Sequence, residues 1–321
     1  MKELDYDWAL RAACQADILP TTRVHFLPDF GHADQSVWVK REDESGFGIS
    51  GCKKRKYASL LPWLRQQGRE VVLIGGPQSN HVVGLTQLLH EAGLPLRAYL
   101  RRAGDPLPRG NGLLRQLLLR EAQVRWVDRA EWPQVEALAR AERPEAVIVP
   151  EGGHLPAALP GACTLWGDLR RNEAELGQTF EHLFIDSGTA FMAGSLLGMK
   201  QLFRPQTHLH VVLTAGDEAF FHQQYARLQS YSTDVLPLGF PSAEHLHLHP
   251  PVTARSFGAV NRKVKDYIPY LAQRYGILTD PVYTAKLFMT AQHIIRSQAL
   301  TGHVLIIHSG GGTGLLGFTF P

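Results

Sequence analysis

Short apolar runs alternate along the chain with longer segments of helical periodicity. Val71–Ile74 and Val304–Ile307 are entirely apolar, which is typical of strands buried on both faces of a parallel sheet. The alternation predicts right-handed βαβ units and therefore an α/β protein. Other strands are expected over 37–40, 96–100, 124–127, 147–149, 182–185 and 208–213, and helices over 56–67, 81–92, 111–122, 133–141, 164–175, 217–231, 282–297 and from about 192. Residues 232–265 show no clear pattern.

The size and composition are those of a globular protein with room for two domains. The chain has 321 residues, of which 44% are hydrophobic and 20% charged, with a net charge of +3. So small a charge favours neither nucleic acid nor an anionic membrane as a partner. No apolar run is long enough to span a membrane, and the three cysteines show no disulfide pattern. We therefore expect a cytoplasmic enzyme or binding protein.

Four turns rich in glycine and small residues come after predicted strands, at 48–53, 75–80, 186–190 and 308–314. In open parallel sheets, ligands bind outside the carboxyl ends of the strands, where all four turns fall. Small residues between a strand and a helix also allow backbone N–H groups to surround a phosphate. The spacings match neither the P-loop nor the dinucleotide-binding fingerprint, so a nucleotide is poorly supported. The sequence predicts a different anionic ligand at this edge.

The first of these turns contains Lys53, at the start of a predicted helix. Neighbouring cations and desolvation lower the pKa of a lysine amine, and a helix start attracts anionic ligands. Taken alone, the basic run 53–56 is more simply explained as an exposed helix start. The three other turns reverse that preference, because four turns facing one crevice are hard to attribute to packing. Lys54 and Arg55 are then expected to be ordinary helix-start cations.

The order and spacing of seven motifs resemble those of one enzyme family. The motifs are Val39–Asp43, Ser50–Lys56, Gly75–His81, Pro150–Gly153, Asp186–Thr189, Asp280–Thr284 and His308–Gly311. Together they resemble the D-cysteine desulfhydrase and 1-aminocyclopropane-1-carboxylate deaminase family, whose members depend on pyridoxal phosphate. The resemblance runs from residue 37 nearly to the C-terminus.

That resemblance implies the fold of the tryptophan synthase β-subunit, known as fold type II. It consists of two open, twisted, mainly parallel sheets flanked by helices, with the active site in a cleft between two domains. Residues 1–53 and 167–321 would form the larger, cofactor-binding domain, and residues 54–166 the smaller one. A homodimer and a small amino-acid substrate are implied in the same way.

The resemblance also implies which residues hold the cofactor. Lys53 would form the internal Schiff base and later shuttle the α-proton of the substrate, as suits an amine of lowered pKa. Lys56, one helical turn on, would reach the phosphate. The backbone amides of Gly188, Thr189 and Ala190 would bind the same phosphate.

Further roles fall on residues near the substrate. Asn80 would donate a hydrogen bond to O3′ of the cofactor and lie beside the substrate. Gln78 and Ser79 would bind the substrate carboxylate or assist proton transfer. Tyr283 would act as an acid, a base or an orienting group.

Ser309, with Thr284 as a second candidate, would face the pyridine nitrogen of the cofactor. A hydroxyl at this place, unlike a carboxylate, is not expected to keep the nitrogen protonated, so the electron sink would be moderated.

Three departures from the family pattern bear on the substrate. A tyrosine usual in the family is missing from residues 256–261, and the phosphate loop continues Ala190-Phe191-Met192 instead of being rich in threonine. Thr284 stands where ring-opening deaminases have a glutamate. The sequence therefore favours β-elimination, as in D-cysteine desulfhydrase, giving pyruvate and ammonia. Ring-opening deamination is the alternative, and the first two departures also suit a pyridoxal-phosphate-binding protein with reduced activity.

Three histidines, His245, His247 and His249, alternate with leucines and would share one face of a strand. Three imidazoles are conceivable metal ligands. No carboxylate or cysteine accompanies them, so we expect no metal and interpret the segment as a solvated strand face or a lid.

Overall fold

Two separate sheets form the centre of the structure, a computed structural model that describes residues 2–32, 35–102, 110–298 and 300–320. Within these residues the larger sheet has six strands, ordered β1-β2-β10-β7-β8-β9, and all neighbours are parallel except β1 and β2. The strands are β1 (Val24–Phe26), β2 (Ser36–Arg41), β7 (His182–Ser187), β8 (His208–Leu213), β9 (Leu246–His249) and β10 (His303–His308).

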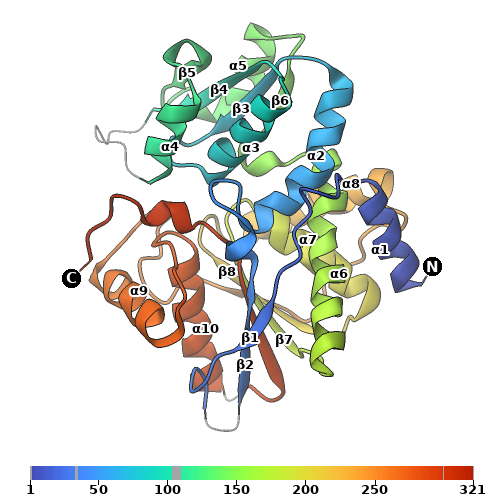
Figure 1. The fold of residues 1–321 in the computed structure, drawn as a ribbon, viewed down its shortest axis with the longest axis vertical. Helices are drawn as coiled ribbons and strands as arrows, with labels where there is room; N and C mark the ends of the chain where they lie inside the picture. Colours follow the sequence, from blue (N-terminus) through green and yellow to red (C-terminus); the bar gives the residue numbers. More distant parts are fainter. Residues whose placement is uncertain (1, 33–34, 103–109, 299, 321) are drawn as a thin grey trace.

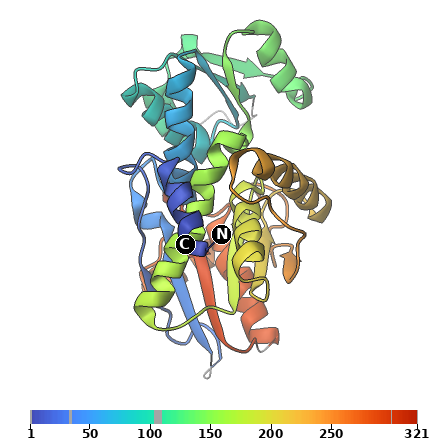
Figure 2. The same ribbon diagram turned by 90° about the vertical axis from the view of Figure 1, so that its right-hand side faces the viewer.

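The smaller sheet is parallel throughout and, in the described chain, has the order β5-β4-β3-β6. Its strands are β3 (Val71–Gly75), β4 (Leu96–Arg101), β5 (Val124–Val127) and β6 (Val147–Val149). Figure 1 shows this sheet above the larger one, and the two sheets also lie in separate halves of the molecule after the rotation to Figure 2.

Helices flank both sheets (Figure 1). They are α1 (Glu3–Ala12), α2 (Cys52–Gln67), α3 (Asn80–Glu91), α4 (Asn111–Leu118), α5 (Val135–Glu142), α6 (Leu159–Leu176), α7 (Phe191–Phe203), α8 (Glu218–Val235), α9 (Arg262–Tyr275) and α10 (Thr284–Gln298).

The predicted fold class is confirmed, since two mostly parallel sheets are flanked by helices. All the predicted strands are present, whereas β1 was not predicted. Helix α6 begins at Leu159 and not at 164, because Pro160 occupies a first-turn position where a proline is tolerated. Helix α9 was missed, since Pro269 lies inside it and interrupts the usual helical signal. The domain boundaries fall near the start of α2 and inside α6, and they stay a prediction.

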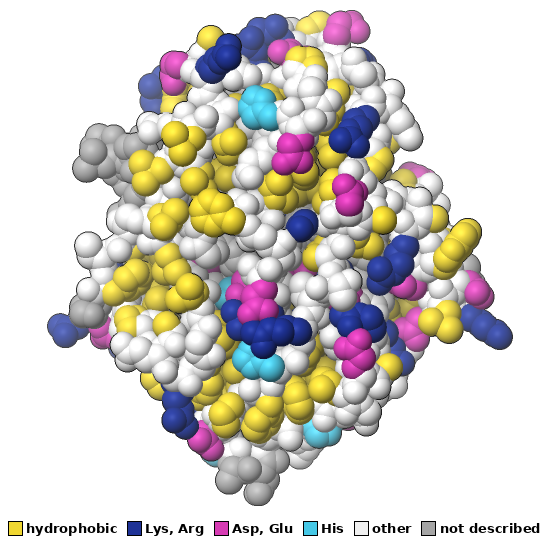
Figure 3. Space-filling view, in the orientation of Figure 1, with side chains coloured by type: hydrophobic (Ala, Val, Ile, Leu, Met, Phe, Trp, Pro, Cys, Tyr) yellow, Lys and Arg dark blue, Asp and Glu magenta, His cyan; other side chains and the backbone are white. Residues whose placement is uncertain are grey.

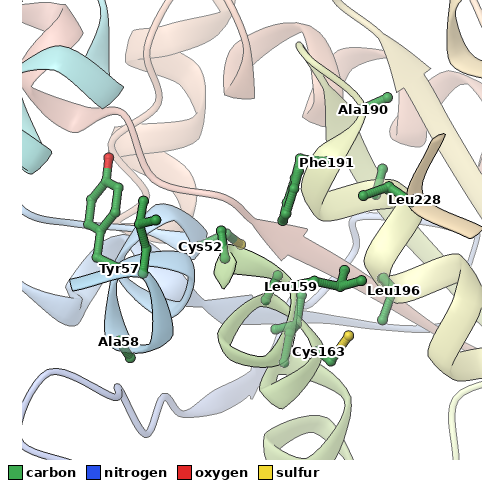
Figure 4. Packing of buried hydrophobic residues seen from close by; sticks show 14 of the residues in the cluster. Cys52, Tyr57, Ala58, Leu159, Cys163, Ala190, Phe191, Leu196 and Leu228 are labelled. Carbon is green, nitrogen blue, oxygen red and sulfur yellow. The ribbon is translucent and has the colours of Figure 1, made fainter. Parts of the chain in front are cut away.

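The main apolar core extends from one sheet to the other through α2, α6 and α7. Figure 4 shows Cys52, Leu159 and Phe191, one from each of these helices, close to one another. A second cluster covers the opposite face of the larger sheet under α10, with Phe184, Val212 and Phe288 among its members. Buried apolar area of this kind provides most of the stability of a fold.

A network of buried charges joins α2 to the larger sheet. Arg55 on α2 donates to both oxygens of Glu42, at 2.7 and 2.6 Å, and to Asp168 Oδ2 on α6 at 2.7 Å. Lys40 on β2 donates to the same Asp168 oxygen at 2.7 Å. Burial opposes ionisation of Glu42, but Arg55 outweighs it and lowers the pKa of that carboxyl. Arg55 is therefore not the exposed helix-start cation expected from the sequence.

Charged side chains protect the exposed edge of the larger sheet at β1. Arg23, next to β1, pairs with Glu44 at 2.6 Å, and behind it Arg41 at the end of β2 forms a largely buried pair with Asp43 at 2.7 Å. Figure 3 shows charged side chains gathered over this part of the surface. Charges at a sheet edge hinder pairing with other strands, because pairing would desolvate them.

Histidines from three neighbouring strands stack on one face of the larger sheet. The rings of His210 and His247 lie 4.5 Å apart at an interplanar angle of 15°, and those of His210 and Phe184 lie 4.3 Å apart at 8°. We call this group the histidine stack; it consists of His182, His208, His210, His245, His247 and His249.

Ring nitrogens of the histidine stack are hydrogen bonded across the strands. His182 Nδ1 lies 3.1 Å from His210 Nε2, and His210 Nδ1 lies 3.1 Å from His249 Nε2. His245 is exposed and His247 and His249 are half-buried, so the face expected to be solvated is partly so, with imidazoles of β7 and β8 beside it on the same face. The described residues contain no group of three or more metal-ligand side chains arranged to hold an ion.

No helix among the described residues is both long and apolar enough to cross a membrane.

Lowering the pH should destabilise the protein through the histidine stack. Burial, followed by the neighbouring imidazoles, lowers the pKa of His210 to about 2, so this ring stays neutral in the fold. In the unfolded chain it takes up a proton below its ordinary pKa of about 6.5. The contribution of the neutral His210 to the stability of the fold is therefore complete above a pH of about 6.5 and is lost as the pH falls below it. Between about pH 7 and pH 5 the free energy of unfolding should drop by about 2 kcal/mol for this one histidine.

Urea unfolding across this pH range tests the prediction. His210→Phe, whose ring can stack on Phe184, should lessen the pH dependence by that amount. Replacing the exposed His222 with Gln should leave the dependence as it is. An identical pH dependence in wild type and His210→Phe would contradict the assignment.

Candidate active site

Lys53 is positioned by a close contact between the start of α2 and the end of β10. Cys52 N donates to Ser309 O at 3.0 Å. Gly51 has a φ of +73°, and a Cβ there would lie 2.0 Å from the same Ser309 oxygen. Glycine is required here because any side chain would push the two segments apart. Lys53 itself is partly buried, and its amine forms no hydrogen bond with any described residue.

Tyr283 is a second residue close to Lys53. The Lys53 amine is 5.9 Å from the centre of the Tyr283 ring. The same ring packs against Gly188, where a Cβ would lie 3.2 Å from Tyr283 Cε1. Burial, then the charges of Asp280 and Asp186, raises the pKa of Tyr283 well above its ordinary value. The phenol is therefore protonated at neutral pH and can act as a hydrogen-bond donor or an acid.

Gln78, Ser79 and Asn80 carry polar side chains in the turn between β3 of the smaller sheet and the start of α3. Ser79 caps the helix, and its hydroxyl accepts from His81 N and Val82 N at 3.2 and 3.3 Å. Asn80 Oδ1 accepts from Asn111 at 2.7 Å, and Gln78 Oε1 accepts from Gly112 N at 2.9 Å. Because both amide oxygens are occupied, the NH₂ groups of Asn80 and Gln78 remain as donors for an anionic ligand.

Asn111 is a site residue that the sequence analysis missed. It is buried at the start of α4 and donates to Asn80 Oδ1 and to Gln78 O, at 2.7 and 3.1 Å. Its own Oδ1 accepts from Thr313 at 2.6 Å. It thus fixes the amide of Asn80 and connects the smaller sheet to the turn after β10. An asparagine at a helix start is an ordinary capping signal, so nothing in the sequence marked it.

Lys56 and the start of α7 form a second polar group at the site. Lys56 is buried and donates to Gly152 O. Burial, followed by the charge of Lys53, lowers the pKa of the Lys56 amine to about 7. Thr189 contacts Gly152, where a Cβ would be 2.4 Å from Thr189 Oγ1. Ala190 has a φ of +62° before the first turn of α7, a conformation in which successive N–H groups can form an anion-binding concavity.

The altered residues of this loop have a packing role. Ala190 and Phe191 are buried in the main core, beside α2 and α6 (Figure 4). The Phe191 ring also lies 5.2 Å from the Lys56 amine. Apolar side chains therefore take the positions at which threonine hydroxyls were expected, while the backbone N–H groups keep their place at the helix start.

The two candidates for facing a ring nitrogen differ in what their hydroxyls already bind. Thr284 Oγ1 donates to Asp280 Oδ2 at 2.7 Å and accepts from Asp280 N at 2.9 Å. Burial raises the pKa of Asp186, and the nearby Ser309 hydroxyl acts in the opposite direction. Since Thr284 is occupied by the cap of α10, Ser309 is the better placed of the two.

Phe257 occupies the segment from which a tyrosine is missing. It is 52% exposed, and its ring makes an edge contact with Tyr283 at 6.0 Å. Residues 256–261 therefore do reach the site, although with an apolar side chain.

Comparison with known proteins identifies the family of this chain. A family model described as pyridoxal-phosphate dependent enzyme matches residues 17–310. The chain belongs to this family. D-cysteine desulfhydrase from Klebsiella pneumoniae is 28% identical to it over 316 residues, which cover 92% of this chain and 93% of that protein. 1-Aminocyclopropane-1-carboxylate deaminase from Methylobacterium nodulans is 27% identical over 304 residues, which cover 88% and 89%.

A solved structure supports the fold assignment. The crystal structure of an ACC deaminase homologue matches 98% of this chain and 97% of its own length, with a TM-score of 0.83 and 23% sequence identity. The chain therefore has the type II fold of pyridoxal-phosphate enzymes.

The residues at the candidate site fit this cofactor. The Lys53 amine is available for covalent attachment, and the start of α7 offers N–H groups to a phosphate. Two buried polar atoms, Asp186 Oδ1 and His81 Nε2, have no hydrogen-bond partner among the described residues. Buried polar atoms usually find a partner, so a polar ligand is expected to lie near them.

Lys56 should take up a proton when a phosphate ligand binds. Above pH 7 its amine is largely neutral, whereas a phosphate dianion beside it favours the charged form. Pyridoxine phosphate, which lacks the aldehyde, allows this step to be measured apart from reaction with Lys53. Calorimetry at about pH 8 in buffers of different ionisation enthalpy should show uptake of roughly one proton per ligand.

Lys56→Met should abolish this uptake and weaken binding, whereas Lys54→Met should change neither. Lys54 serves as the control because its amine donates to Ser45 O at 2.8 Å. Binding to the wild type without proton uptake would contradict the assignment of Lys56.

Proposed function

We propose that this enzyme eliminates the β-substituent of a small amino acid, with D-cysteine as the leading substrate. The net reaction consumes water and releases pyruvate, ammonia and hydrogen sulfide. When bound, pyridoxal phosphate supplies an electron sink for the electron pair left at the α-carbon. The observation that carries the proposal is the occupied hydroxyl of Thr284, which stands where ring-opening deaminases have a glutamate and offers no free acid.

Lys53 and Tyr283 would perform the proton transfers. Lys53 holds the cofactor covalently, and its released amine removes the α-proton of the substrate. Tyr283, protonated at neutral pH and beside Lys53, orients the substrate or donates a proton to the leaving group.

The other residues would bind and orient. Gln78 and Asn80 direct NH₂ donors to the substrate carboxylate and to O3′, respectively, and Ser79 can donate its hydroxyl hydrogen to the same carboxylate. The phosphate is held by Lys56 and by the backbone amides of Gly188, Thr189 and Ala190, while Ser309 faces the ring nitrogen.

We also propose the larger arrangement that accompanies this function. Residues 1–53 and 167–321 form the cofactor-binding domain and residues 54–166 the smaller domain. The enzyme acts as a homodimer in the cytoplasm. Analytical ultracentrifugation and limited proteolysis test the assembly and the domain boundaries.

A screen for release of 2-oxo acids tests the reaction. D-cysteine should give pyruvate and sulfide together, faster than L-cysteine, D-serine or β-chloroalanine. Release of 2-oxobutyrate from the cyclopropane amino acid would favour the ring-opening alternative, for which the relative from Methylobacterium nodulans is named. Cofactor binding without turnover of any of these substrates would instead favour a binding protein of reduced activity, as the altered phosphate loop also suggests.

Exchange of single lysines tests the attachment site. The purified protein should be yellow, and borohydride should fix the cofactor irreversibly to Lys53. Lys53→Ala should abolish this covalent labelling, whereas Lys54→Ala should retain it, since Lys54 only donates to Ser45 O. Mass spectrometry of the labelled peptide identifies the lysine that carries the cofactor. Equal loss of covalent labelling in both variants would mean that Lys53 is not that lysine.

A further inference from the structure

Residues 252–261, between β9 and α9, are fastened to helix α10 by a buried lysine. Lys286 on α10 is 1% exposed, and its amine donates to Ala254 O at 2.8 Å and to Ser256 O at 3.3 Å. A buried amine is costly unless it is hydrogen bonded, so the lysine and the two carbonyls hold each other in place. The segment therefore has a defined position over the start of α10, although it contains no helix or strand up to Asn261.

Phe257 follows directly after one of these carbonyls and contacts the candidate site. Its ring lies 6.0 Å from the Tyr283 ring at an interplanar angle of 62°, an edge contact. The amine of Lys53 lies 5.9 Å from the centre of the same Tyr283 ring. Tyr283 is thus the common neighbour of the lysine expected to react and of this phenyl ring.

The phenyl ring of Phe257 is 52% exposed, although it has no polar atom to interact with water. Single exposed apolar side chains are ordinary at a protein surface. Phe257 differs from them because it contacts the tyrosine beside Lys53 and is held there by the bonds of Lys286. An apolar group of a ligand that covered this ring would be removed from water together with it, which favours binding.

We propose that Phe257 is a specificity-determining residue that selects amino acids whose β-substituent ends in an apolar group, such as thioethers of cysteine. The inference rests on the proposed function, in which Lys53 removes the α-proton and Tyr283 donates a proton to the leaving group. A group attached to the leaving sulfur then extends beyond Tyr283, where Phe257 presents an apolar surface. A phenyl ring can cover an alkyl or aryl group, whereas it offers a free thiol no strong hydrogen bond.

Elimination from a thioether differs from elimination from cysteine only in the group on sulfur. The α C–H bond breaks when the Lys53 amine takes the proton, and its electron pair forms a double bond between the α- and β-carbons. The β C–S bond breaks, and the sulfur leaves with the bonding pair and takes a proton from Tyr283. A thiol is therefore released in place of hydrogen sulfide. Water then replaces the nitrogen, so pyruvate and ammonia form without an oxidant or a reductant.

Binding of amino acids that lack a leaving group tests the proposal without any elimination. Norleucine and alanine differ only in the length of an apolar side chain, and both isomers of each can be titrated by the absorption of the bound cofactor. In the configuration that the enzyme accepts, norleucine should bind about tenfold more tightly, because part of its chain is removed from water against Phe257. Phe257→Ala should remove this difference, whereas Phe257→Leu, which keeps an apolar side chain, should retain most of it.

Phe26→Ala is the matched control. Phe26 lies on β1 at the edge of the larger sheet and is 44% exposed, and its ring packs against Trp38. The Phe26→Ala variant should bind both amino acids as the wild type does. Equal affinities in the wild type, an undiminished preference in Phe257→Ala, or an equal loss of preference in Phe26→Ala would each overturn the proposal.

Turnover separates this inference from the proposed function. The kcat/KM for S-benzyl-D-cysteine should exceed that for D-cysteine by about tenfold in the wild type and lose this advantage in Phe257→Ala. A thioether that reacts no faster than D-cysteine would contradict the inference and leave the proposed reaction standing. Conversely, if neither compound is eliminated while the preference for norleucine depends on Phe257, the proposed reaction fails and the apolar specificity stands.

Discussion

The buried pairing of Arg55 with Glu42 and Asp168 is the interaction on which the site depends. It joins the segment after β2, helix α2 and helix α6, and all three side chains are almost completely buried. Removing one partner would leave an uncompensated charge in the interior, which typically costs about 3–5 kcal/mol. Because Arg55 lies on the same helical turn as Lys53 and Lys56, the pairing fixes the rotation of α2 and with it the direction of both lysines.

Local features of the site were predictable from the sequence, whereas its supporting contacts were not. The buried strands, the four glycine turns and the position of Lys53 all follow from short-range patterns, and they are present where expected. Asp168 meets Arg55 across 113 positions, and Thr313 meets Asn111 across 202. Such partners are chosen by the packing of distant elements, so a single sequence contains no periodic signal for them.

The histidine stack shows that a local pattern can be correct while the neighbours of a strand stay unpredicted. Alternation with leucine does place the imidazoles of His247 and His249 on one face of β9, whereas His245 precedes the strand with a φ of +46°. How far that face is solvated depends on the strand beside it, and parallel pairing with β8 brings His210 into register with His247. The sequence of a strand determines which of its side chains share a face. Which strand pairs with it is determined only when the sheet assembles.

Of the four buried or partly buried cations at the start of α2, Lys53, Arg55 and Lys56 differ in charge and contacts because their neighbours differ. Arg55 is neutralised by two carboxylates and stays charged. Lys56 is buried beside Lys53 with only a carbonyl as acceptor, so its pKa falls to about 7, and a phosphate would supply the negative charge that favours its charged form. Lys53 has no hydrogen-bond partner within the described chain and lies within the field of Asp186. In the proposed function, Arg55 holds the fold, Lys56 binds an anion and Lys53 reacts, and the positions of the nearby carboxylates separate these roles.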